Sequence, residues 1–335
     1  MSMNLVGRVD GHLRQTGALP PQSPILMAVS GGQDSLCLAR ILLDLRPAWG
    51  WQLTLAYCDH GWRRDSAATG DHLHQLAQAW GIPFVQVQAN PSPQSEAAGR
   101  RWRYQALTTL AQDQGCTHVV TGHTASDRAE TLLYNLVRGS GLEGLVALVA
   151  GRPLAKGVFL VRPLVGVTRP ETAAFCQAHQ LPVWVDDTNQ NLALRRNRLR
   201  HVVLPYLRDH FNPQVEAALT RTAHLVAQDV DYLNAQAATL YQRAYQAHPP
   251  CLDRWALARA HPALQSRAIR QFLITHLPHA PSHRHMEAVL GLLSAPAGQQ
   301  TLPLPGGYVV RSQGRWLHLL KRQPAPDHPP QSSLK

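Results

Sequence analysis

Apolar and polar residues alternate along the first two thirds of the chain in a pattern that predicts an α/β domain. Five short apolar runs have the length of buried strands, and they are Ile25–Val29, Leu53–Tyr57, Phe84–Val87, His118–Thr121 and Val158–Val161. Between and after the first four runs, apolar residues recur at helical spacing near 35–46, 66–80, 95–114 and 126–138. This alternation predicts a parallel sheet with helices on both faces.

A change of pattern near residues 205–213 predicts a second domain, because Pro205 and "FNPQ" interrupt an arginine-rich helix there. Beyond this point, the spacing of one long amphipathic helix is held by Leu219, Val226, Val230, Leu233, Ala237 and Leu240. The closing stretch "QQTLPLPGGYVVRSQGRWLHLLK" has strand-like runs around two glycine turns, which predicts a small β-meander. We therefore expect an N-terminal segment (1–23), an α/β domain (24–210), a smaller, mainly helical domain (211–321) and a disordered tail (322–335).

The stretch "ILMAVSGGQDSLCLARILLDL" places a polar turn between the first strand and the first helix. Gly31 and Gly32 let the backbone approach a phosphate closely, and the helix N-terminus offers unpaired amides. Ser30 and Ser35 add hydroxyl groups. Asp34 would repel a phosphate unless magnesium lay between them, because this ion takes carboxylate and phosphate oxygens together. The alternative is an ordinary strand-to-helix turn in which Asp34 or Ser35 caps the helix.

Two further polar segments follow strand ends, "CDHGWRRDS" and "GHTASDRAET". The carboxyl ends of parallel strands lie at one edge of a sheet, where ligands bind, so the three loops predict one site. His123, Asp127 and Glu130 lie at spacings of four and three, so one helix face presents all three. The alternative is a first helical turn that simply favours acidic residues. After the fifth strand, Thr168 and Glu171 have the spacing of a capping box that starts another helix.

Composition favours a polyanionic partner. The chain has a net charge of +11, and its 32 basic residues include only three lysines. Arginine suits phosphate groups, which indicates nucleic acid. A genome rich in G and C would explain the ratio of arginine to lysine, but not the surplus over acidic residues. The sequence has no apolar leader and no run long enough to span a membrane, so we expect a soluble cytoplasmic protein without a membrane partner.

Several other classes of site are disfavoured by the sequence. It has no Gly-Lys pair, hence no Walker A loop, and its five cysteines are scattered without a C-x-x-C, which argues against a zinc ribbon or a disulfide framework. "GSGLEG" at 139–144 matches a dinucleotide fingerprint but follows a helix. It is therefore either a glycine-rich loop over a ligand or a helix C-cap and turn. "HRHME" at 283–287 fits a solvated helix start better than a metal site.

The strand followed by "SGGQDS" resembles the PP-loop of the N-type ATP pyrophosphatases, which split ATP into AMP and pyrophosphate by adenylating a substrate. Six further segments resemble one family of that superfamily, tRNA(Ile)-lysidine synthase, in their order and approximate spacing. They are "DHGWR", "SEAAGRRWRY", "TGHTASDRAETLLYNLVRGSGLEGL", "RPLVGVTRPE", "VDDTN" and "RRNRLRHVVLPYL". The resemblance is strong over residues 24–210 and looser over the later helical region.

The resemblance implies a ligase that joins L-lysine to C2 of the wobble cytidine in the CAU anticodon of tRNA(Ile), forming lysidine. In that family, cytosine O2 attacks the α-phosphate of ATP and releases pyrophosphate, and the lysine amine then displaces AMP. Such chemistry needs positioning and charge neutralisation more than an enzyme nucleophile, which fits a chain without a catalytic Cys or Ser constellation. The implied cofactors are ATP and Mg2+.

The resemblance also implies roles for individual residues. The ATP-binding turn would comprise Ser30, Gly31, Gly32, Gln33, Asp34 and Ser35. The metal would be held by Asp34 and Asp127, and Arg100 would stabilise the adenylated intermediate unless it only pairs with Glu96 on its helix. Asp127 or Glu130 would bind the lysine or take its proton. Candidates for contact with substrate or intermediate are His60, Arg63, His123 and Arg138.

Three residues depart from the family pattern Gly-His-His-x-Asp-Asp-Gln-Ala-Glu-Thr. Thr124, Ser126 and Arg128 stand at the second His, the first Asp and the Gln. Ser126 removes one potential magnesium ligand, so Asp127 would act alone or with water in place of a second carboxylate.

Two features are candidates for RNA contact. The segment "LRRNRLRH" at 194–201 contains Arg195, Arg196, Arg198 and Arg200. These arginines fit phosphate contact or, equally, a solvated basic helix that fastens the domain junction. Selecting one cytidine requires an unstacked base with aromatic or arginine partners. Trp62 and Trp102 are candidates for that contact, although tryptophan is more often a core residue.

The sequence leaves two competing hypotheses about function open. Another PP-loop enzyme, such as a tRNA thiolase or an amide-forming synthetase, would need paired cysteines or an amidotransferase domain, and the sequence offers neither. A non-catalytic nucleotide-binding or RNA-binding protein would release no pyrophosphate, and it would not need Asp34, Asp127 and Glu130 at one edge. The sequence does not fix the oligomeric state, for which a homodimer is one candidate.

Overall fold

The structure is a computed structural model that describes residues 4–62, 66–146, 148–184, 192–193 and 195–321. The segment "VDDTN" and the tail predicted to be disordered lie outside these residues. The chain divides into two compact units, Met1–Ala227 and Gln228–Lys335, and each is described by itself.

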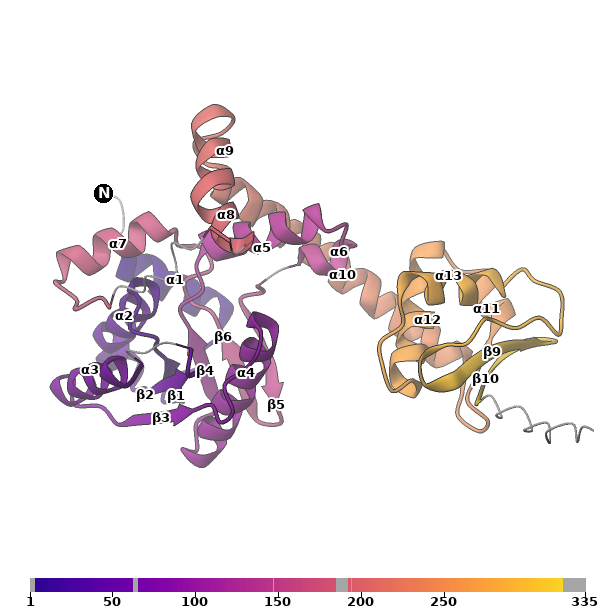
Figure 1. The fold of residues 1–335 in the computed structure, drawn as a ribbon, viewed down its shortest axis with the longest axis horizontal. Coiled ribbons are helices and arrows are strands. Elements are labelled where there is room, and N and C mark those ends of the chain that lie inside the picture. Colours follow the sequence, from indigo (N-terminus) through magenta and orange to yellow (C-terminus); the bar gives the residue numbers. More distant parts are fainter. Residues whose placement is uncertain (1–3, 63–65, 147, 185–191, 194, 322–335) are drawn as a thin grey trace, which may run out of the picture. The chain divides into compact units, whose positions relative to one another are not determined.

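A six-stranded sheet forms the centre of the first unit (Figure 1). Its strands are β1 (Pro24–Ala28), β2 (Gln52–Asp59), β3 (Phe84–Gln88), β4 (His118–Thr121), β5 (Gly151–Ala155) and β6 (Val158–Val161). They lie in the order β3-β2-β1-β4-β6-β5, and all neighbours are parallel except β5 and β6. This confirms the predicted parallel sheet. Because β2 and β4 flank β1, the strand order changes direction there, which is where sheets of this class bind ligands.

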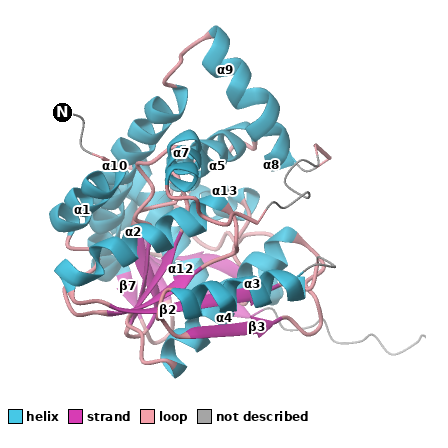
Figure 2. Cartoon of the chain, turned by 90° about the vertical axis from the view of Figure 1, so that its left-hand side faces the viewer, coloured by secondary structure: helices cyan, strands magenta, loops and turns pink. Residues whose placement is uncertain are grey.

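Helices cover both faces of the sheet, as predicted (Figure 2). They are α1 (Leu5–Thr16), α2 (Gln33–Trp49), α3 (Ser66–Ala79), α4 (Glu96–Asp113), α5 (Ala125–Val137), α6 (Leu142–Leu145), α7 (Arg169–Ala178), α8 (Arg195–Arg198), η2 (Leu199–Val203) and α9 (Leu204–His210). Side chains alternate along β1, so Ile25 and Met27 join the core formed with α1, α2, α3 and α7. Leu26 points the other way and joins the core under α4.

Besides the one-turn helix α6, two elements of this unit are absent from the sequence prediction. Helix α1 lies within residues 1–23, where two glycines weaken the helical pattern, yet Val9 and Leu13 are buried in the core that α1 shares with α2. Strand β5 is an antiparallel edge strand with Gly151 and Pro153, which are residue types depleted in strands. Both elements extend the predicted architecture without changing its class.

Pro205 does not interrupt the helix that contains it, so this part of the sequence prediction is wrong. Helices α8, η2 and α9 follow one another without a gap from Arg195 to His210, and Pro205 lies in the first turn of α9. Segment η2 is π-helical, and this wider turn directly before Pro205 accommodates the ring and the missing donor. The helix ends at "FNPQ" instead, as the other half of that prediction requires.

The second unit combines helices with a small antiparallel sheet. Its elements are the end of α10 (Val215–Ala244), β7 (Tyr245–Gln246), β8 (Cys251–Asp253), α11 (Arg254–Ala258), α12 (Pro262–His276), α13 (His283–Gly291), η3 (Pro305–Gly307), β9 (Tyr308–Gln313) and β10 (Trp316–Lys321). The long helix α10 confirms the predicted amphipathic helix. The sheet has the order β7-β8-β10-β9, so the predicted C-terminal strands pair with each other and also with the chain near residue 252. Strands β7 and β8 are too short for a sequence pattern to reveal them. The limits 24–210 and 211–321 stay a prediction.

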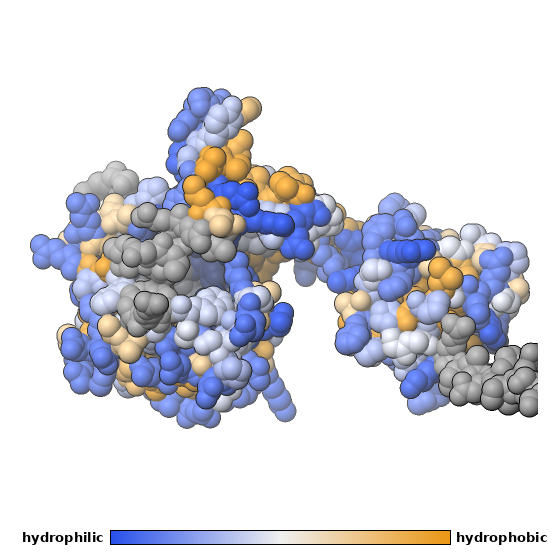
Figure 3. Space-filling model, in the orientation of Figure 1, coloured by the Kyte–Doolittle hydropathy of each residue, from blue (hydrophilic) through white to orange (hydrophobic). Residues whose placement is uncertain are grey.

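Within the described residues, no helix is both long and apolar enough to cross a membrane. Hydrophobic side chains are nevertheless exposed on and beside α5, η2 and α9 (Figure 3), and they include Val137, Val202, Tyr206 and Phe211. Such a group is larger than the singly exposed apolar residues that are normal on a protein surface.

Candidate active site

The polar turn after β1 has the geometry of an anion-binding loop. Gly31 has φ +83°, and a Cβ atom there would stand 3.2 Å from Trp184 Cβ and 3.3 Å from Thr69 Cγ2, so both the conformation and the space require glycine. Gly32 is the N-cap of α2, and no side chain caps its amides. Ser35 Oγ accepts from Ser30 N at 3.1 Å and donates to Gly32 O at 2.9 Å, which fixes the loop. The first amides of α2 thus remain available to an anion.

Asp34 is held by helix α7, a contact that the sequence analysis did not foresee. Thr172 Oγ1 donates a hydrogen bond to Asp34 Oδ1, and Arg169 Nε lies 3.1 Å from Asp34 Oδ2. Burial raises the pKa of Asp34 above its ordinary value, although Arg169 and Thr172 act in the opposite direction. A buried carboxylate whose charge is only partly compensated is suited to bind an added cation.

Gly122 lets strand β4 come close to the same turn. A Cβ atom at this position would stand 2.8 Å from the Asp34 carbonyl oxygen and 2.9 Å from Ser35 Cα. Both of these atoms belong to backbone, so they have little freedom to move away. The approach brings the end of β4, and with it the start of α5, next to the anion-binding loop.

Asp127 caps helix α5 and faces three arginines. Its Oδ2 accepts from Thr124 N and Thr124 Oγ1, both at 2.9 Å, which closes a capping box. Its Oδ1 lies 3.5 Å from Arg196 and from Arg200, and 3.6 Å from Arg169. Burial by itself would raise the pKa of Asp127, but Arg169 and Arg196 outweigh it and hold this pKa at about 2. The carboxylate is therefore charged at neutral pH.

Glu130 lies one helical turn further along α5 and is buried, with 1% of its surface exposed. Arg196 Nε donates to its Oε2 at 3.0 Å, and Arg200 donates from Nε to Oε1 at 2.7 Å and from Nη2 to Oε2 at 2.9 Å. The charge of Glu130 is thus compensated from two directions. Two of the four arginines predicted to contact RNA face these carboxylates, whereas Arg195 and Arg198 are exposed.

Arg169 joins the two halves of the site, since its guanidinium is within ion-pair distance of both Asp34 and Asp127. It lies at the N-terminus of α7, directly after Thr168, whose Oγ1 and N donate to Glu171 Oε2 at 2.7 Å. This confirms the predicted capping box. The signal that points to Arg169 in the sequence is its position after the last strand of the sheet, at the same edge as the other three loops.

A basic and aromatic group lies at the same edge, on the α4 side of the sheet. Arg100 stacks over the ring of Tyr104 at 5.6 Å, and among the described residues no ion pair joins it to Glu96. His60 stacks on Trp62, with ring centroids 4.9 Å apart. His123 Nδ1 is 2.8 Å from Thr121 Oγ1, and burial lowers the pKa of His123 to about 3, so its imidazole is neutral.

Comparison with known proteins identifies the family of the chain. Residues 7–207 match the family model of the PP-loop domain, and residues 252–317 match that of the TilS substrate binding domain. The chain is 50% identical over 319 residues to the tRNA(Ile)-lysidine synthase of Thermosynechococcus vestitus, which covers 95% of this chain and 92% of that protein. It is 48% identical over 309 residues to the tRNA(Ile)-lysidine synthase of Nostoc sp., with 88% and 90% covered. The chain belongs to the tRNA(Ile)-lysidine synthase family.

The fold of this lysidine synthase family member is shared with a solved structure of low sequence identity. The U34-tRNA thiolase NcsA of Methanococcus maripaludis superimposes with a TM-score of 0.54 over 66% of this chain and 78% of that chain, at 16% identity. A likeness at this identity shows the common fold alone. It agrees with the predicted α/β class, and the PP-loop resemblance is confirmed by the family model matched by residues 7–207.

The other residues expected from the family resemblance differ in their positions. Gln33 belongs to the Asp34 centre, because its Nε2 donates to Asp34 Oδ1 at 3.4 Å, and it links α2 to α7 by donating to Arg169 O and Thr172 Oγ1, both at 3.0 Å. Arg138 is the C-cap of α5 and is exposed, and Gly139 has φ +74°, so "GSGLEG" begins as a helix C-cap and turn before α6. Arg63 lies outside the described residues. The roles of all these site residues stay predictions.

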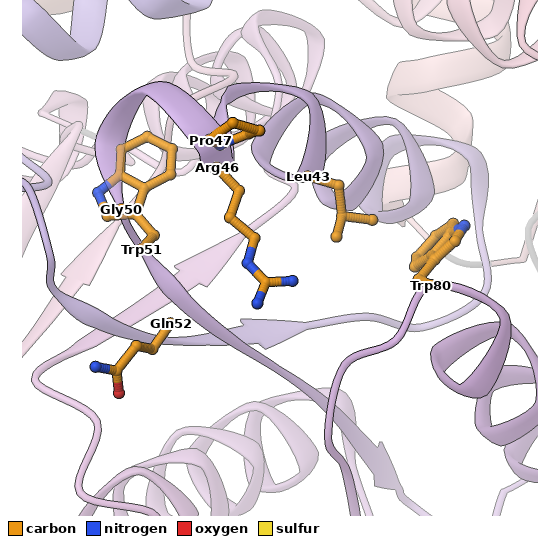
Figure 4. Close-up of a pocket in the computed structure, with 7 residues that line it drawn as sticks. All are labelled: Leu43, Arg46, Pro47, Gly50, Trp51, Gln52 and Trp80. Atoms are coloured by element: carbon orange, nitrogen blue, oxygen red, sulfur yellow. The ribbon is translucent and has the colours of Figure 1, made fainter.

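The pocket shown in Figure 4 is not this site. It is lined by Leu43, Arg46, Pro47, Gly50, Trp51, Gln52 and Trp80. Gln52 begins β2 and Gly50 follows α2, so this depression lies at the amino edge of the sheet, opposite the carboxyl edge where the functional loops meet. Its lining has no carboxylate or histidine.

Proposed function

We propose that this chain uses ATP to ligate L-lysine to C2 of the wobble cytidine in tRNA(Ile) with a CAU anticodon, and releases pyrophosphate and AMP. The observation that carries the proposal is the meeting of two unlike centres at one sheet edge. The anion-binding turn with Asp34 fits ATP, the Asp127 and Glu130 pair fits a cationic amino acid, and Arg169 lies between them. ATP, lysine and tRNA are cytoplasmic, and we place the enzyme there.

The turn would bind the pyrophosphate part of ATP through the first amides of α2 and the hydroxyls of Ser30 and Ser35. Asp34 would hold magnesium. Arg169 lies within ion-pair distance of both Asp34 and Asp127 Oδ1, so the two carboxylates face the same space. No group of three metal-ligating side chains occurs among the described residues, so oxygens of ATP and water would complete the shell. When bound, the ion neutralises charge that develops on the transferred phosphate. Arg100 lies near the same edge and forms no ion pair with any described residue, so it is suited to stabilise an adenylated base.

Asp127 and Glu130 support recognition of the lysine ammonium group. Both carboxylates already accept cationic donors from Arg196 and Arg200, which shows that their surroundings favour positive charge. The lysine chain would take the place of one guanidinium. Because the pKa of Asp127 is held at about 2, this carboxylate is a weak base, and it suits an ammonium ligand better than a proton acceptor.

For tRNA, the exposed Arg195 and Arg198 are available to phosphates, and the region 211–321 would provide a second contact. The name of the family model matched by residues 252–317, which describes a substrate binding domain, supports this assignment. A thiolase reaction finds no support among the five cysteines. Four of them are buried, and burial raises the pKa of the half-buried Cys58 to about 12, far from the value of a reactive thiol.

The test is incorporation of labelled lysine into a tRNA(Ile) transcript with a CAU anticodon, in the presence of ATP and magnesium. We expect incorporation that depends on both, together with one pyrophosphate per lysine. Asp34→Asn should abolish both signals, because it removes the carboxylate charge at the turn while keeping the shape.

A tRNA(Met) transcript, which has the same anticodon, is the specificity control and should remain unlabelled. Release of pyrophosphate with tRNA(Ile) but without incorporated lysine would contradict ligation and leave only the adenylation half of the proposal.

A further inference from the structure

Trp62 is exposed yet fixed in position. Half of its surface is accessible to solvent, but its Nε1 donates to Pro93 O at 2.6 Å and its ring stacks on His60 with an angle of 25° between planes. His60 in turn meets the edge of Trp102 at 5.0 Å. Gly99 of α4 lies against the indole, where a Cβ atom would stand 2.4 Å from Trp62 Cη2. A large aromatic surface is thus held rigidly in contact with water, although its burial would be favourable.

A group of four arginines surrounds Tyr104 on the same helix. The guanidinium carbons of Arg100, Arg103 and Arg152 lie 5.6, 5.8 and 5.1 Å from the ring centroid, and Arg162 Nη2 donates to the Tyr104 hydroxyl at 3.2 Å. Arg162 is only 2% exposed, and its Nε has no hydrogen-bond partner. Within the described part of the chain, none of the four forms an ion pair with a carboxylate.

So many like charges in one place repel one another, and burial adds a desolvation cost for Arg103 and Arg162. The pKa values of Arg103 and Arg162 are lowered, first by burial and then in part by Arg100. An anion would offset this cost, and the guanidinium fork matches phosphate oxygens. The two features adjoin, because Gly99 contacts Trp62 and the charge of Arg103 acts on His60.

ATP is a poor explanation for this anion. Its phosphates have their own loop at the start of α2, and α2 belongs to the core on the other face of the sheet from α4. A nucleic acid supplies what both features need, since an unpaired nucleotide offers a flat base and a phosphate diester a few ångströms apart.

We propose that Trp62 and the arginine group around Tyr104 form one binding site for an unpaired nucleotide of the anticodon loop, with the base stacked on Trp62 and a backbone phosphate held by the arginines. The identity of the RNA rests on the proposed function. The site would hold the loop beside the modified cytidine, and it shares Arg100 with the centre proposed for the adenylated base.

Stacking is tested with two substitutions of similar hydrophobicity. Trp62→Phe keeps an aromatic face, whereas Trp62→Leu keeps apolar bulk without one. We measure the Kd of an anticodon stem-loop without ATP or lysine, and the KM of each substrate for wild type and both variants. Trp62→Leu should raise the Kd and the KM for RNA by roughly 5- to 100-fold, Trp62→Phe by less than about fivefold, and the KM for ATP should not change.

The charge component is tested by the salt dependence of binding. Arg152→Gln removes one exposed member of the group, and Arg101→Gln, also exposed on α4 but outside the group, is its matched control. Arg152→Gln should reduce the slope of log K against log salt by about 0.7, as expected for one lost contact to a single-stranded phosphate. Arg101→Gln and Trp62→Leu should leave that slope unchanged.

The outcomes separate this inference from the proposed function. If wild type forms lysidine but Trp62→Leu binds and reacts with RNA like wild type, the nucleotide site is refuted and the function stands. If wild type forms no lysidine yet the stem-loop binds through Trp62 and Arg152, the function fails and the site survives. An increase in the KM for ATP in Arg152→Gln, with unchanged RNA binding, would assign the arginines to ATP and refute the site.

Discussion

Glu130 illustrates how a buried charge is tolerated at a site built for a charged substrate. With 1% exposure it has lost nearly all its hydration, and Arg196 and Arg200 replace the lost water with three hydrogen bonds. Such an arrangement contributes little net free energy to folding. Removal of one partner is nevertheless strongly destabilising, because the remaining charges stay in a poorly hydrated place.

We therefore expect Glu130→Gln to lower the free energy of unfolding by about 2 kcal/mol or more and to raise the KM for lysine. Denaturant unfolding and steady-state kinetics measure the two effects. Glu287→Gln, at an exposed position on α13 with an exposed ion pair to His283, is the control and should leave both quantities nearly unchanged. A Glu130→Gln enzyme with normal stability would show that solvent or another carboxylate compensates the charges of Arg196 and Arg200.

Gly122 is important because the backbone of the ATP-binding turn lies where a side chain at this position would be. Gly122→Ala would press a methyl group against the backbone of Asp34 and Ser35, at 2.8 and 2.9 Å. Overpacking of this kind costs about 1–3 kcal/mol, and here the displaced atoms belong to the ATP-binding turn, so the KM for ATP should rise as well.

The control for Gly122 is Gly11→Ala on α1, where an added Cβ atom meets nothing within 4 Å. This substitution should leave the KM for ATP unchanged and stabilise the helix by about 0.5–1 kcal/mol. Equal effects of the two substitutions on ATP binding would remove the argument for close approach of β4 to the turn.

At the scale of elements, the N-terminus of α7 ties the site to the fold. Glu171 accepts from Thr168 in the capping box and also forms an ion pair with Arg8 of α1. Burial by itself would raise the pKa of Glu171, but the Thr168 amide and Arg8 lower it below its ordinary value of 4.5. The same helix presents Arg169 and Thr172 to Asp34, so the cap also positions the site.

Glu171→Gln should lower the free energy of unfolding by about 1 kcal/mol at neutral pH. Since the pKa of Glu171 is lower in the folded state, its contribution is present above pH 4.5 and is lost as the pH falls below that value. The gap between wild type and variant in denaturant unfolding should therefore shrink in acid. A gap that is constant from neutral to acidic pH would show that the charge of Glu171 is not what stabilises the cap.

The sequence predicts most elements of the first unit because their signals are local. The strands β1 and β4 are apolar runs. The start of α2 is marked by "SGGQDS" and the start of α7 by the pair Thr168 and Glu171. What local patterns miss has a tertiary cause: α1 and β5 are stabilised by the neighbours they pack against, and Pro205 is accommodated by a π turn. Long-range packing decides such cases, not residue preference.

The candidate site follows the same division at the scale of the molecule. The carboxyl-edge rule foretold that Asp34 would meet the loop of Asp127. It did not foretell that Arg169 would lie between them, or that Arg196 and Arg200 would turn toward Glu130 instead of solvent. Those contacts join residues 42 or more positions apart along the chain, and only the folded arrangement of α5, α7, α8 and η2 reveals them.

The net charge of +11 leads to a prediction for the whole chain. Affinity for tRNA(Ile) should fall steeply and linearly on a plot of log K against log salt, because each neutralised phosphate releases counterions. Between about 50 and 200 mM salt we expect a loss of at least tenfold, measured by filter binding or fluorescence anisotropy. Affinity that is insensitive to salt would mean that the surplus of arginine serves another purpose.

The position of Arg169 makes the two halves of the site thermodynamically dependent on each other. A cation that binds at Asp34 and a cation that binds at Asp127 both compete with one guanidinium, which lies 3.1 and 3.6 Å from the two carboxylates. By linkage, whatever factor the first ligand imposes on the affinity for the second, the second imposes on the first. ATP and lysine would then change each other's affinity through the single side chain of Arg169, with no need for a moving lid.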